Sequence, residues 1–308
     1  MTLNNPEEFR SGFAAVAGRP NVGKSTLINA LLGQKIAAVS PKPQTTRINQ
    51  LGILTDEHAQ VVFVDTPGLH LPHNKLGEGM NAVAAQALID ADVVLWLVDA
   101  NEPPHDEDQI ITAHLAELRE LPPVLQVLNK TDLINDEVLA QRRTEYARLF
   151  PRITQIPVSA ISGKGLPELL AAVIALLPQG EALFPADQVT DLYERDIAAD
   201  LIREAALQHL REEVPYALAV RIDDFQERSE DNAFISATLF VEKDSQKGIV
   251  IGKGGAMLKD IGQTARAAIE NMSGRKVYLE LRVKVSKNWR SNPAFLKQMG
   301  YSDLGEGS

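Results

Sequence analysis

Short apolar runs alternate with helix-type patterns over the first 180 residues. Near-continuous apolar runs predict five buried strands, at Phe13–Ala17, Val61–Val64, Val93–Val98, Val124–Leu128 and Ile156–Val158. Helical spacing of apolar residues predicts helices between them, at Lys24–Leu32, Met80–Ile89, Asp106–Leu118, Asp136–Phe150 and Leu166–Leu177. Strands that are apolar throughout are typical of a parallel sheet covered on both faces. This half therefore predicts a doubly wound α/β domain.

The second half of the chain has a different order of elements. The expected elements are a helix at Asp191–Glu213 and alternating strands at Tyr216–Ile222 and Phe234–Val241. Helical segments follow, interrupted by a glycine loop after the apolar run Ile249–Ile251, and the segment after the loop is Ala256–Glu270. A last strand is expected at Lys276–Val285. This α-β-β-α-α-β order predicts a smaller α+β domain. Pro178, Gly180 and Pro185 interrupt the first pattern. We expect one domain over residues 1–180, a linker over 181–190 and a second domain over 191–308.

The charge of the chain is distributed unevenly. The 308 residues carry a net charge of −10, which by itself argues against a nucleic-acid partner. Residues 1–242 hold 19 basic and 35 acidic residues, whereas residues 243–300 hold 12 basic and 4 acidic ones. The net charge therefore does not exclude a nucleic-acid partner for the C-terminal part.

Other classes of protein are excluded more firmly. The absence of cysteine excludes disulfides, iron–sulfur clusters, cysteine zinc sites and thiol nucleophiles. The six histidines have no partners at metal-ligand spacing, and we expect them in loops or at the surface. The N-terminus lacks the apolar core of a secretory signal, and no apolar run approaches the roughly 20 residues of a membrane span. We expect a cytoplasmic protein.

A phosphate-loop pattern lies between the first predicted strand and the first predicted helix. The sequence from Gly18 to Ser25 reads GRPNVGKS. Its glycines permit a tight loop whose N–H groups point at phosphates, and the N-terminus of the following helix adds a favourable dipole. Lys24 would place a charge on the β- and γ-phosphates, and Ser25 would ligate Mg²⁺. The nucleotide contacts expected here are Gly18, Asn21, Val22, Gly23, Lys24, Ser25 and Thr26.

A second motif identifies the base. Asn129-Lys130-Thr131-Asp132 follows the fourth apolar run. Its aspartate can accept both N1–H and the exocyclic amine of guanine, whereas adenine would leave the carboxylate unpaired. After the last strand, Ser159 and Ala160 would support the base through backbone contacts. The predicted nucleotides are therefore GTP and GDP.

Two further segments suit the switch loops that sense the γ-phosphate. Asp65 and Gly68, in Asp-Thr-Pro-Gly, end the second apolar run. Asp65 can hold Mg²⁺ through its water shell, and the amide of Gly68 can contact the γ-phosphate. The polar stretch at residues 40–47 offers Thr46 as a Mg²⁺ ligand, with Thr45 as the alternative.

These motifs carry a family resemblance. They occur in the order found in the translation-factor-related GTPases, and GRPNVGKSTLIN, PQTTR and the following second domain resemble the Era family. The resemblance covers nearly the whole chain. It implies a bacterial GTPase of small-ribosomal-subunit assembly, whose partners are the small subunit and the 3′ end of its ribosomal RNA.

One position departs from the Ras-like pattern. Leu69 follows Gly68, where Ras-like enzymes carry a glutamine that orients the attacking water. Leucine cannot hydrogen-bond to water, so we assign no side chain as a catalytic base and expect slow intrinsic hydrolysis. Related GTPases with an apolar residue here can use K⁺ beside an asparagine that matches Asn21. Mg²⁺ is thus the expected cofactor, and K⁺ is a hypothesis.

The basic segment contains a second glycine loop. Gly252-Lys253-Gly254-Gly255 fits the GxxG loop of KH domains, and the order of elements is that of the type II KH fold. The GxxG pattern is common by chance, but here an apolar run precedes it and a helix follows it. The expected RNA contacts are Ile251, Gly252, Lys253, Gly254, Gly255, Lys259, Lys287 and Arg290. Trp289 is either a stacking residue or a packing residue.

We therefore predict a monomeric GTPase switch, in which a P-loop GTPase domain precedes a type II KH domain and nucleotide state controls RNA binding. A GTPase of tRNA modification is a rival, but those relatives keep a cysteine near the C-terminus and this chain has none. A second rival is an adaptor that binds RNA or a membrane surface under the control of nucleotide, and whose GTP hydrolysis is incidental. Leu69 is compatible with this rival, because it cannot orient the attacking water. Peripheral association with the inner face of the cell membrane also stays open.

Overall fold

The computed structural model describes residues 9–38, 46–118, 120–229 and 231–301. The chain divides into two compact units. The main part of the first unit ends at Asp191, and the main part of the second begins at Leu192. Each unit has its own sheet and its own apolar core.

The first unit is built on a six-stranded sheet with the order β2-β3-β1-β4-β5-β6. Its strands are β1 (Arg10–Ala17), β2 (Gln50–Thr55), β3 (Ala59–Asp65), β4 (Val93–Asp99), β5 (Val124–Asn129) and β6 (Thr154–Pro157). All neighbouring pairs are parallel except β2 with β3. The antiparallel edge strand β2 was not predicted.

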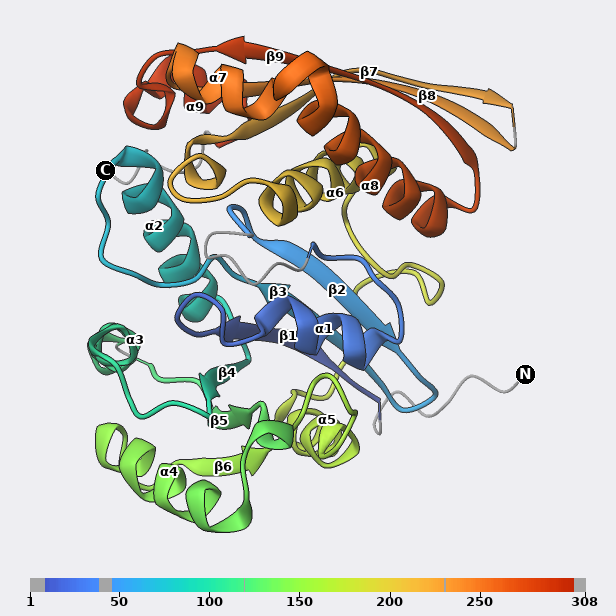
Figure 1. The fold of residues 1–308 in the computed structure, drawn as a ribbon. Helices are drawn as coiled ribbons and strands as arrows, with labels where there is room; N and C mark the ends of the chain where they lie inside the picture. The colour runs from blue at the N-terminus through green and yellow to red at the C-terminus, as the bar shows by residue number, and fades with distance from the viewer. Residues whose placement is uncertain (1–8, 39–45, 119, 230, 302–308) are drawn as a thin grey trace. The chain divides into compact units, whose positions relative to one another are not determined.

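Helices cover both faces of this sheet (Figure 1). One face packs against α1 (Lys24–Leu32) and α5 (Leu166–Leu176), and the other against α2 (Lys75–Ile89), α3 (Asp106–Glu117) and α4 (Asp136–Leu149). Strand β1 shows the reason. Its side chains alternate, so that Val16 lies in the first core cluster and Ala17 in the second, and both are fully buried. The predicted doubly wound domain is confirmed.

Residues 181–191, called here the strap, are bonded to this sheet. The side chain of Gln60 on β3 accepts a hydrogen bond from the N–H of Phe184 at 2.9 Å and donates one to its carbonyl at 2.8 Å. The N–H of Ile53 on β2 donates to the carbonyl of Val189 at 2.9 Å. Most of the strap is the segment that the sequence suggested as a linker, and it is held along the β2 edge of the first unit.

The second unit contains a three-stranded sheet with the order β7-β8-β9. Its elements are α6 (Glu194–His209), β7 (Ala219–Ser229), β8 (Asn232–Val241), α7 (Asp244–Ile251), α8 (Ala256–Ser273), β9 (Lys276–Val285) and α9 (Pro293–Gln298). Strand β8 pairs antiparallel with β7 and parallel with β9. The predicted α-β-β-α-α-β order is present, and α9 follows it as an unpredicted addition.

The two faces of this smaller sheet differ. Helices α6, α7 and α8 pack on one face around Leu239 and the other inward side chains of β8. On the opposite face, Phe240 packs edge to face against Phe295 of α9, with ring centroids 5.1 Å apart. Trp289 is fully buried, and its Nε1 donates to the carbonyl of Ala217 at 2.8 Å. Trp289 is therefore a packing residue. Among the helices of the described ranges, none is long and apolar enough to cross a membrane.

Candidate functional site

The phosphate-loop pattern forms the turn between β1 and α1. Asn21 and Gly23 both have positive φ, at 66° and 101°. A Cβ on Gly23 would lie 2.5 Å from Nδ2 of Asn129, so the turn requires glycine there. Helix α1 begins at Lys24, and its unpaired N–H groups open towards the loop. The remaining predicted contacts lie on the same turn and the start of the helix: Gly18, Val22 and Thr26.

Lys24 is buried beneath this loop. Its Nζ donates to the carbonyls of Gly18 at 3.0 Å and Arg19 at 3.2 Å. Burial lowers the pKa of Lys24 to about 8, although the carboxylate of Asp65 opposes that shift. Phosphate groups in the loop would oppose it further, because they favour the charged ammonium group.

The three residues predicted to hold Mg²⁺ lie together. The hydroxyl of Ser25 donates to Oδ2 of Asp65 at 2.6 Å, and Oγ1 of Thr46 lies 3.1 Å from both of those oxygens. The residues come from the start of α1, the end of β3 and the segment before β2. Mg²⁺ prefers oxygen ligands, so this set fits the ion chemically. The alternative ligand, Thr45, lies outside the described residues.

The guanine motif begins at the end of β5. Asn129 is the last residue of that strand and is 2% exposed. The side-chain Nδ2 of Asn129 donates to the carbonyl of Val22 at 2.9 Å, and its Oδ1 accepts from the N–H of Ala160 at 3.0 Å. Asn129 therefore holds the phosphate loop and the loop after β6 together. Lys130 has positive φ, at 64°, and its Nζ lies 2.6 Å from Oδ2 of Asp99.

The remaining guanine contacts lie beside this motif. The hydroxyl of Ser159 donates to Oδ1 of Asp132 at 2.6 Å, and this bond fixes the carboxylate that would accept from the base. The carboxylate of Asp132 is exposed, whereas Ser159 is fully buried. The structure thus brings the two predicted guanine loops together at one end of the sheet.

The second switch segment lies against the phosphate loop. The N–H of Leu69 donates to the carbonyl of Gly18 at 3.3 Å, and a Cβ on Gly68 would lie 2.9 Å from the nitrogen of Pro20. The Leu69 side chain is fully buried in the core cluster beneath α2. It is directed into the core and offers no polar group to an attacking water.

Sequence reasoning missed part of the surroundings of the switch. His70 lies in a loop, as expected, but it is buried, and its Nδ1 lies 2.8 Å from the carbonyl of Gly68. The side chain of Asn81 on α2 donates to the carbonyl of His70 at 2.6 Å. No pattern in the sequence connects these positions, because the contact depends on how α2 packs.

An ion-pair network around the largely buried Arg19 supports the phosphate loop and was also missed. Arg19 pairs with Glu102, and its Nε lies 3.6 Å from Oδ2 of Asp108. Asp108 is fully buried at the start of α3, and burial raises the pKa of its carboxyl, while the N–H of His105 and the charge of Arg19 oppose the shift. These partners are more than 80 residues apart in the chain, so no local signal could have found them.

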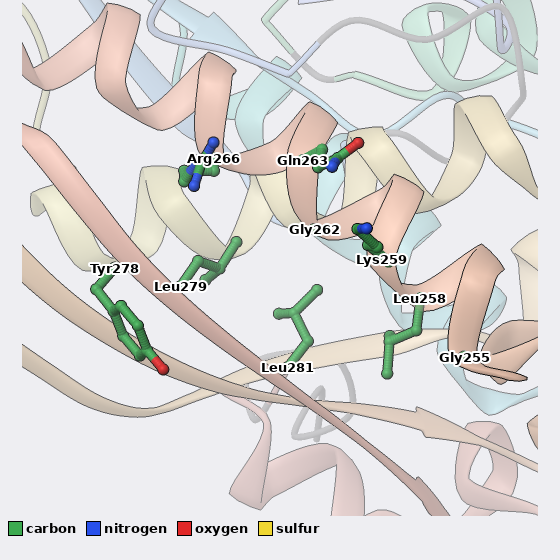
Figure 2. A pocket seen from close by; sticks show the side chains of 9 residues that line it. All are labelled: Gly255, Leu258, Lys259, Gly262, Gln263, Arg266, Tyr278, Leu279 and Leu281. Atoms are coloured by element: carbon green, nitrogen blue, oxygen red, sulfur yellow. The ribbon is translucent and has the colours of Figure 1, made fainter.

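The second candidate site is an open groove of about 430 Å³ between α8 and β9. Its lining residues on and before α8 recur at helical spacing and therefore share one face of that helix. Figure 2 shows these side chains facing Leu279 and Leu281 of β9, whereas the ring of Tyr278 lies on the other side of that strand. The lining residues are Gly255, Leu258, Lys259, Gly262, Gln263, Arg266, Tyr278, Leu279 and Leu281.

The GxxG loop borders this groove. Gly252, Gly254 and Gly255 all have positive φ, and a Cβ on Gly252 would lie 2.7 Å from Cβ of Met257. Lys253 is exposed in the loop. The structure thus places the predicted glycines at one end of a groove whose charged lining residues are both cations, Lys259 and Arg266.

The other predicted RNA contacts lie apart from the lining of the groove. Ile251 is half-buried at the end of α7, and Lys287 is exposed after β9. Arg290 is held by Glu242, with Nη2 and Oε2 2.6 Å apart. Contact of Arg290 with RNA would have to compete with this ion pair.

Two family models match the chain. The model described as 50S ribosome-binding GTPase matches residues 13–130, and the model described as KH domain matches residues 213–290. The first match includes the phosphate loop, the Mg²⁺ side chains and Asn129, and the second includes the GxxG loop and the groove.

Curated relatives match over nearly the whole length. GTPase Era of Geobacter metallireducens is 48% identical over 301 residues, which cover 97% of this chain and 99% of that protein. GTPase Era of Heliobacterium modesticaldum is 44% identical over 297 residues, which cover 96% of this chain and 99% of that protein.

Solved structures agree with these relatives. A crystal structure of Era in complex with MgGDPNP and nucleotides 1506-1542 of 16S ribosomal RNA has a TM-score of 0.90 and 39% identity, covering 96% of this chain and 99% of that one. An Aquifex aeolicus Era variant bound to GDP.AlF4- also has a TM-score of 0.90 and 39% identity, covering 96% of this chain and 100% of that one. The chain therefore belongs to the Era family of GTPases.

Proposed function

We propose that this protein is a GTP-hydrolysing switch that binds the 3′ end of small-subunit ribosomal RNA through its KH domain during assembly of the small ribosomal subunit. One observation carries the proposal: the same chain holds the side chains needed to bind a guanine nucleotide with Mg²⁺ and a groove whose lining includes Lys259 and Arg266. The Era structure with MgGDPNP and 16S ribosomal RNA holds both kinds of ligand, which supports the proposal.

The nucleotide contacts proposed are those predicted from the sequence, in the domain that ends before the strap. Ser25 and Thr46 would hold Mg²⁺ directly, and Asp65 would hold it through water. The ion supplies positive charge that neutralises the β- and γ-phosphate oxygens. Lys24 would add a further positive charge, and the bond from Ser159 would hold the carboxylate of Asp132 towards the base.

The base specificity has a direct test. Replacing Asp132→Asn exchanges a carboxylate that accepts from guanine for an amide that can donate to xanthine, so preference should move from GTP towards xanthosine triphosphate. Asp136→Asn is the matched control, because it removes an exposed carboxylate four residues away. Retained GTP preference in Asp132→Asn would contradict the assigned contact.

Hydrolysis needs a positioning element other than Leu69, since that side chain is buried in the core. We infer that K⁺ bound beside Asn21 supplies it, because Asn21 is exposed on the phosphate loop in a left-handed conformation. Turnover should be faster in KCl than in NaCl at equal ionic strength. Equal rates in the two salts would remove K⁺ from the mechanism.

The link between the two sites is tested by RNA-stimulated turnover. Ribosomal RNA should accelerate GTP hydrolysis, and Gly252→Asp should abolish that stimulation without changing nucleotide affinity. A Cβ at Gly252 would contact Met257 and could disturb the fold, so Lys253→Glu, at an exposed position, serves as a second variant.

RNA binding without any stimulation of GTP hydrolysis would instead favour an adaptor whose hydrolysis is incidental. Equal RNA affinity with GDP and with a GTP analogue would refute the coupling.

We also expect the protein to be cytoplasmic and monomeric. Light scattering of the purified chain would check that it is a monomer. Association with the inner face of the membrane is a separate hypothesis. Co-sedimentation with anionic lipid vesicles tests it, and absence of binding would contradict it.

A further inference from the structure

Three side chains form a row across the sheet of the KH domain, on the face opposite α6 and α8. Arg228, Phe234 and Tyr278 come from β7, β8 and β9. The rings of Phe234 and Tyr278 are stacked, with centroids 5.7 Å apart and planes inclined by 16°. The guanidinium group of Arg228 lies 4.7 Å from the centroid of the Phe234 ring. The three residues therefore form a continuous stack, here called the aromatic row.

The outer end of the aromatic row is open. Phe234 and Tyr278 are partners in the pairing of β8 with β9, so Phe234 covers the ring face of Tyr278 that is turned towards β8. Strand β9 is the last strand of this sheet, and the other ring face is therefore turned towards the sheet edge. Tyr278 is 65% exposed, which is high for a side chain of this size.

This open ring face adjoins the RNA groove. Tyr278 lines the groove together with Arg266 of α8. Figure 2 shows these two residues at one end of the groove and Gly255 and Leu258 at the other. The aromatic row thus meets the groove at the end that is far from the GxxG loop.

We propose that the aromatic row is a stacking site for one additional RNA base, next to the nucleotides that the GxxG loop holds. This inference rests on the proposed function, since it assumes single-stranded RNA in the groove. A GxxG loop holds about four nucleotides, so a longer strand continues beyond it. Aromatic faces stack on any base, and Arg228 adds a cation to the row.

The charges at this end of the groove favour RNA as the occupant. Lys259 and Arg266 are the charged residues of the lining, and in the described part of the chain neither forms an ion pair. In Figure 2 Arg266 lies on the α8 side of β9 and the Tyr278 ring on the other side, so RNA that crosses the β9 edge can stack a base on Tyr278 and place a phosphate at Arg266. A flat aromatic surface beside a free cation suits a nucleotide.

The test uses the full-length protein and single-stranded RNA from nucleotides 1506–1542 of 16S ribosomal RNA. The RNA is shortened from each end to the shortest fragment that the wild type binds, and is then lengthened by one nucleotide at either end. At one of the two ends, the added nucleotide should increase affinity roughly 5- to 100-fold. An abasic nucleotide at that position should give no increase. A 2-aminopurine there should lose fluorescence on binding, as expected for a stacked base.

Three variants separate stacking from structure. Tyr278→Ala should bind the shortest RNA as the wild type does but lose the gain from the added base, whereas Tyr278→Phe should keep the gain. Tyr193→Ala is the matched control, because Tyr193 is 75% exposed and does not line the groove. Thermal unfolding of each variant checks that the fold is retained.

The outcomes distinguish this inference from the function on which it rests. If the wild type binds none of the RNA fragments, the proposed function and this inference fail together. If the wild type binds the shortest fragment but the added base raises the affinity of Tyr278→Ala as much as that of the wild type, the stacking site alone is overturned. If Tyr278→Ala weakens binding to intact small subunits but not to RNA fragments, the aromatic row contacts a protein, and the inference is overturned as well.

Discussion

The side-chain N–H of Asn129 donates to the carbonyl of Val22 at 2.9 Å, so the end of β5 holds the phosphate loop in place. The same side chain accepts a hydrogen bond from the N–H of Ala160. One asparagine therefore joins the phosphate end and the guanine end of the nucleotide site. Its role in this structure is to connect loops.

Asn129→Ala is expected to weaken nucleotide binding and also to destabilise the nucleotide-free protein. The substitution leaves buried backbone groups without partners, at a cost of about 1–3 kcal/mol. Urea unfolding without nucleotide and GDP titration measure the two effects. A variant with weaker GDP binding but unchanged unfolding free energy would show that Asn129 acts only on the nucleotide.

Nucleotide binding should take up protons at alkaline pH. Burial lowers the pKa of Lys24 to about 8, so at pH 8.5 the free protein holds Lys24 largely neutral. Bound phosphates raise that pKa, and up to about one proton is then taken up on binding. Affinity for GDP should accordingly fall as the pH rises above 8. Calorimetry at pH 8.5 in buffers of different ionisation enthalpy measures the uptake.

The control for this proton uptake is Lys24→Arg, because arginine stays charged in both states. The variant should bind GDP, if at all, without the proton uptake assigned to Lys24. Uptake of the same size in Lys24→Arg would assign the proton to another group.

Gln60→Ala should destabilise the first unit by about 1–3 kcal/mol. Gln60 is fully buried and bonds the strap at Phe184, so truncation leaves backbone groups of the strap unpaired. Gln86→Ala is the matched control, since Gln86 is exposed and its side-chain amide donates to the carboxylate of Asp90 at the surface. Denaturant unfolding compares the two, and equal effects would contradict the role of Gln60.

Trp289→Ala should destabilise the KH domain by about 3–5 kcal/mol, because it empties a buried site and removes the donor to Ala217. Trp289→Phe keeps most of the volume and should retain RNA affinity. If Trp289→Phe unfolds like the wild type but binds RNA poorly, Trp289 contacts RNA and the packing interpretation is wrong.

RNA affinity should fall steeply with salt although the whole protein is acidic. Lys259→Ala and Arg266→Ala should each weaken binding and reduce the slope of log affinity against log salt by about 0.7, the value for one phosphate contact on a single strand. Lys164→Ala is the control, because Lys164 is exposed in the first unit. An unchanged slope in both groove variants would place the phosphates elsewhere.

The sequence predicts the buried strands well and misses one edge strand, β2. Strands β1, β3, β4 and β5 are apolar along most of their length, because both faces of the sheet are covered. Strand β2 escaped prediction because Gly52 interrupts its apolar residues and the polar residues Gln50 and Thr55 end it on both sides. Helix α9 has only six residues, too few for a periodic pattern.

The candidate site shows a similar division. Ser25, Thr46 and Asp65 were identified from local motifs, and the structure places them within hydrogen-bonding distance. The pair of Arg19 with Glu102 could not be identified, because it depends on how the loop after β4 folds back. Tyr278 was missed for the same reason, since its position beside the groove follows from the pairing of β8 with β9.

The bonding of the strap has a consequence for dissecting the molecule. A fragment cut at residue 180 would leave the side chain of Gln60 without its partners and the β2 edge uncovered. Exposed strand edges recruit other chains, so such a fragment should aggregate. A fragment that extends to Asp191 keeps the edge covered and is the shorter piece expected to stay in solution on its own.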